Sequence, residues 1–114
     1  MAIGLTQLSV TISNGTSLSP AVGLGDGSLV GIAMPAGWDG ATLSFQVSID
    51  GGTTWLEMES ISAAVSVAAA SGQFIAIDPA IWRGVNHVKV RSGTAASPVN
   101  QTADRALTLI TRRF

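Results

Sequence analysis

Cysteine, histidine and charge are scarce in this sequence, and each scarcity excludes a class of function. None of the 114 residues is cysteine, which excludes disulfide bridges, thiol catalysis and cysteine metal sites. His87 is the single histidine, so no multi-histidine metal site can form. We therefore expect no metal ion or other cofactor, and a fold stabilised by burial of apolar side chains.

Charged residues make up 11% of the chain, compared with about 25% in an ordinary soluble domain. The 7 acidic and 6 basic residues give a net charge of -1 and form no basic stripe, so we predict no nucleic-acid partner. Every apolar run is too short for the roughly 20 residues of a membrane span, which predicts no membrane partner. A surface with so little charge favours burial in an assembly.

The chain shows no internal repeat and no proline-rich or charged linker, so residues 1–114 are predicted to form a single domain. Residues 1–7 carry no charged side chain and are expected to extend from that domain. They also lack the basic region and sustained apolar run of a secretory signal, which predicts synthesis in the cytoplasm.

Apolar and polar residues alternate in short blocks, the pattern of half-buried strands. The clearest blocks lie at 8–12, 43–49, 88–90 and 107–109, and in the second the apolar side chains expected to face the core are Leu43, Phe45, Val47 and Ile49. Weaker blocks lie at 29–32, 55–58, 65–69 and 74–77. The sequence thus predicts an all-β fold, an antiparallel β-sandwich or barrel of about 7–8 short strands.

One short helical turn is predicted between the strands. Asp78 can cap it, Pro79 suits its first position and Gly84 can end it. The alanine-rich run at 63–70 is interpreted as strand, because valines interrupt it and Ser71 and Gly72 close it early.

The sharpest local pattern is SIDGGTTW at 48–55, which resembles the Asp-box hairpin repeated around sialidase propellers. Its defining positions are Ser48, Asp50, Gly52, Thr54 and Trp55. The aspartate of such a turn accepts backbone N–H bonds, and glycine supplies a positive φ. Sialidases use a tyrosine nucleophile, which this chain lacks, and 114 residues are too few for a propeller. We therefore interpret the box as a structural turn, and the sequence leaves open whether Ca²⁺ binds near it.

Catalytic constellations are not apparent, and we predict that the protein is not an enzyme. Glu57 and Glu59 share one strand face and are the closest approach to a carboxylate pair, an arrangement typical of a solvated edge. His87 has no G-x-S-x-G nucleophile motif to accompany it and is expected on the outward face of a strand.

Beyond the box, several segments resemble small structural proteins of tailed bacteriophages. They are NGTSLS at 14–19, VGIAMPAGW at 30–38, IDP at 77–79 and VKVRSGT at 88–94. The resemblance implies a head decoration, or cement, protein: a non-enzymatic β-domain on the capsid surface of a virion, often a homotrimer, made in the host cytoplasm and bound to the major capsid protein. The alternative is a carbohydrate-binding or tail- or fibre-associated β module, with tryptophans as a stacking surface for a glycan.

Position and chemistry select the residues expected to contact such partners. The uncharged N-terminus offers apolar side chains, the C-terminus offers two cations before an aromatic ring, and two tryptophans could cover the ends of the sandwich. The candidate interface residues are Ala2, Ile3, Leu5, Trp38, Trp82, Arg112, Arg113 and Phe114.

Overall fold

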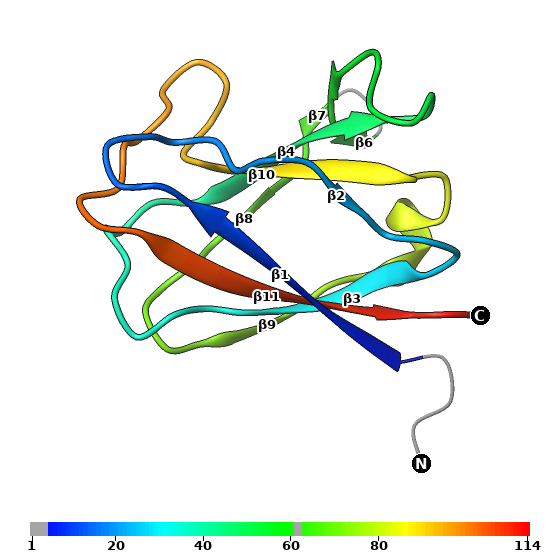
Figure 1. The fold of residues 1–114 in the computed structure, drawn as a ribbon, viewed down its shortest axis with the longest axis horizontal. Helices are drawn as coiled ribbons and strands as arrows, with labels where there is room; N and C mark the ends of the chain where they lie inside the picture. The colour runs from blue at the N-terminus through cyan, green and yellow to red at the C-terminus, as the bar shows by residue number, and fades with distance from the viewer. Residues whose placement is uncertain (1–4, 61–62) are drawn as a thin grey trace.

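The computed structural model describes residues 5–60 and 63–114, and these residues form two antiparallel sheets that face each other across an apolar core (Figure 1). The predicted all-β class is confirmed. The elements follow in the order β1 (Leu5–Ile12), β2 (Val22–Gly23), β3 (Ser28–Ala33), β4 (Leu43–Ser48), β5 (Leu56–Glu57), β6 (Glu59–Ser60), β7 (Ala63–Ala64), β8 (Ser66–Val67), β9 (Phe74–Ala76), the 3-10 turn η1 (Pro79–Trp82), β10 (His87–Ser92) and β11 (Arg105–Arg112).

The first sheet has the strand order β1-β11-β3-β9, so the first and last strands of the chain are neighbours. β1 and β11 pair without a break, from Leu5 opposite Arg112 to Ile12 opposite Arg105. The second sheet has the order β2-β10-β4-β5, and β8 pairs with another part of β4. A small third pair joins β6 to β7.

The core lies between the two sheets, and the period-2 pattern predicts most of it. The long strands alternate as expected: they contribute Val10 and Ile12 from β1, Val88 and Val90 from β10, and Leu107 and Leu109 from β11, all of them buried. Burial of such side chains contributes about 1.5–3 kcal/mol each.

The expectation for Ile49 is wrong. It is 74% exposed, because β4 ends at Ser48 and Ile49 already belongs to the following turn. Ser44 and Ser48, expected on the outer face, are buried because other polar groups cover them and bond to their hydroxyls. Alternation detects a strand face, but it does not detect what covers the other face.

Most of the weaker strand blocks are shorter than predicted. Of the block at 55–58 only Leu56–Glu57 is strand, and of the block at 65–69 only Ser66–Val67. The alanine-rich run is extended rather than helical where the structure describes it, as predicted. The sandwich therefore has more, but shorter, strands than the 7–8 expected.

The predicted helical turn is confirmed as η1. The Asp78 carboxylate accepts a hydrogen bond from the Ala80 N–H at 3.0 Å, and Pro79 starts the turn. At the N-terminus, residues 5–7 of the predicted extension belong to β1, while residues 1–4 lie outside the described part of the chain.

Candidate interaction surface

The start of β1, the C-terminus and η1 lie at one end of the sandwich (Figure 1). Leu5 opens β1 directly opposite Arg112, and Phe114 follows two residues later. The Arg83 guanidinium, just after η1, lies 5.3 Å from the centroid of the Phe114 ring. We call Leu5, Ile81, Arg83 and Phe114 the terminal patch.

The terminal patch combines three exposed apolar side chains with one cation, Arg83. Leu5 is 42% exposed, Ile81 38% and Phe114 71%, although single exposed apolar residues are common on protein surfaces. Arg112 and Arg113 are exposed beside it, and the Arg113 guanidinium lies 3.8 Å from the Asp26 carboxylate. That ion pair is fully solvated and contributes little, so Arg113 remains able to exchange partners.

Two of the predicted interface residues are core residues, so this part of the prediction is wrong. Trp82 is 1% exposed and packs edge-on against Phe45, with 4.9 Å between the ring centroids. Trp38 is 8% exposed, and its indole N–H donates to the Ala41 carbonyl at 3.0 Å. Both rings therefore belong to the apolar core. Ala2 and Ile3 lie outside the described residues.

The Asp-box forms the hydrogen-bonded turn that its sequence predicts. Asp50 Oδ1 accepts bonds from the Ser48 hydroxyl at 2.8 Å and from the Thr53 and Thr54 N–H groups at 3.1 and 2.9 Å. The Gly52 N–H donates in turn to Ser48 Oγ at 2.8 Å. The Thr54 backbone N–H, followed by the Ser48 hydroxyl, lowers the pKa of Asp50 from 3.8 to about 2.

Trp55, the last box residue, belongs to the same turn. Its indole N–H donates to the Gly52 carbonyl at 3.0 Å, and the Lys89 ammonium lies 4.5 Å from the centroid of its ring. One face of the ring is therefore occupied by a cation. With Trp38 and Trp82 in the core, the three tryptophans do not form a shared stacking platform.

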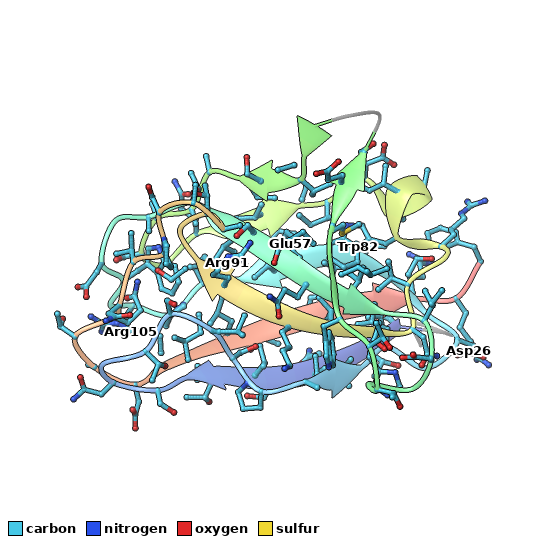
Figure 2. The ribbon with its side chains drawn as sticks, turned by 90° about the horizontal axis from the view of Figure 1, so that it is seen from above. Asp26, Glu57, Trp82, Arg91 and Arg105 are labelled. Atoms are coloured by element: carbon cyan, nitrogen blue, oxygen red, sulfur yellow. The ribbon has the colours of Figure 1, made fainter. Side chains whose placement is uncertain are left out.

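A pocket of about 160 Å³ lies against the second sheet, between apolar walls that include Phe45, Met58 and Val65. Arg91 and Glu57 also line it (Figure 2). Arg91 Nη1 donates to Glu57 Oε2 at 3.0 Å, Arg91 Nη2 donates to Glu57 Oε1, and the Arg91 Nε–H donates to Ser44 Oγ at 2.9 Å. Sequence analysis missed this pair, since no local signal links residues 34 positions apart.

The charged groups in the pocket, Arg91 and Glu57, form an ion pair with each other. The Arg91 hydrogen bonds hold the pKa of Glu57 below its usual range, and partial burial opposes them. A carboxylate that is ionised and bonded on both oxygens is unsuited to act as a general acid near neutral pH. Glu59 also lines the pocket but comes from β6 rather than β5, so the two glutamates do not share one strand face as predicted.

His87 is half-buried rather than on an open outward face. It lies in β10 between Ser48 of β4 and Gly23 of β2. Its Nδ1 is buried, and no hydrogen-bond partner for it lies among the described residues. The position suits packing within the sheet, and the hydroxyl of Ser48, which pairs opposite His87, is engaged in the Asp-box turn with Asp50 and Gly52.

A second polar network joins the loops at the opposite end of the sandwich. The Asp39 carboxylate accepts from the Thr102 N–H at 2.6 Å and from Arg105 Nη2 at 3.2 Å. Buried Gln101 donates to the Ser92 hydroxyl at 2.8 Å. The Thr102 bonds, chiefly, lower the pKa of Asp39. This network was also missed, because it is assembled from residues 63 and 66 positions apart.

Within the ranges that the structure describes, three or more acidic or histidine side chains nowhere converge in a way that could hold a metal ion. In the same ranges, no helix has both the length and the apolar character needed to cross a membrane.

The chain matches no protein-family model, no curated protein and no solved structure. The features of the described residues that bear on function are the terminal patch, the Asp-box turn and the polar clusters around Arg91 and Asp39.

Proposed function

We propose that the protein is a non-enzymatic virion component, a decoration or cement protein that binds the outer surface of a phage capsid through the terminal patch. The observation that carries this proposal is the exposure of Leu5, Ile81 and Phe114 at the end of the sandwich where β1 begins and the C-terminus lies. Exposed apolar side chains gathered at one place, with polar groups at their margin, are typical of protein interaction sites.

The proposed partner is the major capsid protein. An apolar groove on the capsid would take the Phe114 ring, and burying one such side chain contributes about 1.5–3 kcal/mol. Arg112 and Arg113 would pair with acidic groups at the edge of that groove. Copies that bind the expanded capsid lattice better than the immature lattice would stabilise the expanded form by mass action.

Self-association is part of the same proposal. A chain with 11% charged residues and a net charge of -1 has little electrostatic repulsion between copies. We propose a homotrimer on the capsid surface, made in the host cytoplasm and assembled onto the virion. Light scattering on the purified protein tests the trimer separately from capsid binding.

Co-sedimentation with capsids of the phage that encodes the protein tests the proposed contact. We expect saturable binding of the wild type and a Kd about tenfold weaker for Phe114→Ala, equivalent to about 1.4 kcal/mol. Phe74→Ala is the matched control, because Phe74 is also well exposed, at 63%, but lies on β9, where it pairs opposite Ala33. It should bind capsids as the wild type does.

Substitution is a sharper test here than removal of residues 2–7, which would cut into β1. Wild-type protein that does not sediment with capsids, or Phe114→Ala protein that binds as tightly as wild type, would contradict the proposed contact. Quenching of tryptophan fluorescence by oligosaccharides, combined with absent capsid binding, would favour the carbohydrate-binding or fibre-associated alternative.

A further inference from the structure

β1 is an edge strand with one side open. Its eight residues pair with β11 on one side, and no other strand in the described part of the chain pairs with its second side. Figure 2 shows β1, in blue, along the border of the ribbon. A row of backbone N–H and C=O groups on such an edge is a template for another strand.

The edge lacks the features that usually protect an open strand. β1 contains no proline and no charged side chain, and its pairing with β11 has no bulge. The first charged side chain of the whole sequence is Asp26. The other sheet edges are much shorter: β9 has three residues, and β2 and β5 have two each. β1 is therefore the longest and least protected edge of the sandwich.

We propose that β1 pairs with β1 of a second copy of this chain, antiparallel and about a two-fold axis. Such a contact places residues near the middle of the strand close to their own counterparts, where a charge would meet the same charge, so the pairing requires these positions to be uncharged. β1 satisfies this condition because it is uncharged throughout. Gln7 and Ser9, both exposed, lie on the same face and can form hydrogen bonds across the pair.

The pairing joins two four-stranded sheets into one continuous antiparallel sheet in the order β9-β3-β11-β1-β1-β11-β3-β9. Eight residues of strand span roughly 26 Å at about 3.3 Å per residue, so the interface is small. Small interfaces give weak complexes, and the association is expected to depend on protein concentration. The proposal does not rest on capsid binding, which involves the terminal patch. If the basic unit is a trimer, β1 links trimers.

The test compares Gln7→Lys/Ser9→Lys with the wild type by light scattering over a range of concentrations. At high concentration the wild type should have twice the mass of this variant, whose self-association should be at least tenfold weaker. The matched control is Ser71→Lys/Gln73→Lys, which adds the same charges to the same residue types at exposed positions before β9. The control should associate as the wild type does.

The decisive experiment mixes two variants of opposite charge. The Lys variant mixed with Gln7→Glu/Ser9→Glu should regain the doubled mass, because opposite charges then meet across the strands, and only folded chains can respond in this way. Amide hydrogen exchange of β1 in the wild type should also slow as concentration rises. Equal masses for wild type and Lys variant at every concentration, or loss of association in the control, would overturn the proposal.

Discussion

Asp50 holds the Asp-box turn through one carboxylate oxygen that accepts three hydrogen bonds. Two of the donors are backbone N–H groups that would otherwise lack a partner within the turn. The side chain lies at the surface, so its role depends on geometry rather than burial. Asp50 therefore serves as the hydrogen-bond acceptor that fixes the turn.

Asp50→Ala should lower the melting temperature by several degrees, because the Thr53 and Thr54 N–H groups lose their acceptor. The control is Asp26→Ala. Asp26 also precedes a glycine in a turn, but it forms only a long, exposed ion pair with Arg113 among the described residues. Circular dichroism melts of the two variants check the difference. Equal shifts would mean that the Asp50 bonds do not stabilise the turn.

Gly93 is constrained by its own backbone and by its neighbours. It has φ of 89°, and a Cβ at this position would lie 2.5 Å from the Ser97 carbonyl oxygen and 2.8 Å from the Val99 nitrogen. Backbone atoms cannot move aside as a flexible side chain can, so Gly93→Ala should cost about 1–3 kcal/mol in the free energy of unfolding. Urea denaturation of the variant and the wild type measures this loss of stability. Gly40→Ala is the control, because a Cβ there meets nothing within 4 Å, and a similar loss in both variants would refute the explanation.

At the scale of elements, Arg91 and Glu57 connect β10 to β5 across β4, which lies between them. Gln46 of β4 also donates to Glu57 Oε2 at 2.9 Å, so three neighbouring strands share one polar cluster. The Arg91 side chain is 8% exposed and that of Glu57 is 41% exposed. The cluster holds the two-residue strand β5 against the sheet where few apolar contacts are available.

Glu57→Gln should destabilise the protein by about 1–2 kcal/mol, a value at the lower end for charged hydrogen bonds because Glu57 is partly solvated. The buried Arg91 guanidinium would then lack its counter-charge. Glu59→Gln, in the same pocket, is the matched control and should leave the free energy of unfolding unchanged. Arg91→Met/Glu57→Met should recover most of the loss. If Arg91→Met/Glu57→Met is less stable than Glu57→Gln, the ion pair contributes stability beyond neutralising the buried Arg91 charge.

At the scale of the whole molecule, three carboxylates have pKa values below their usual range: Asp39, Asp50 and Glu57. A carboxylate with a lowered pKa in the folded protein contributes stability above its unfolded pKa and loses it as pH falls through the folded pKa. Stability should therefore be constant near neutral pH and fall below about pH 4.5, continuing toward pH 2, where Asp50 titrates.

Urea denaturation at pH 7, 4 and 2.5 tests this acid dependence. The variant Asp39→Asn/Asp50→Asn/Glu57→Gln should be less stable than the wild type at pH 7 and should lose much less stability on acidification. A parallel decline in both proteins would show that other groups are responsible for the acid sensitivity.

The sequence by itself determined the elements whose interactions lie within a few residues. The alternation at 8–12, 88–90 and 107–109 predicted buried strand faces, the Asp78 cap predicted η1, and SIDGGTTW predicted a hydrogen-bonded turn. In each case the residues that make the contact are close along the chain, so their spacing carries the information.

Only the tertiary structure decided which distant residues meet. It paired Arg91 with Glu57, joined Asp39 to Arg105, placed Trp38 and Trp82 in the core, and brought Leu5 to the same end as Phe114. These outcomes depend on strand order, and sequence spacing does not specify which strands become neighbours. The open edge of β1 has the same origin, because a strand is an edge only in relation to the sheet that contains it.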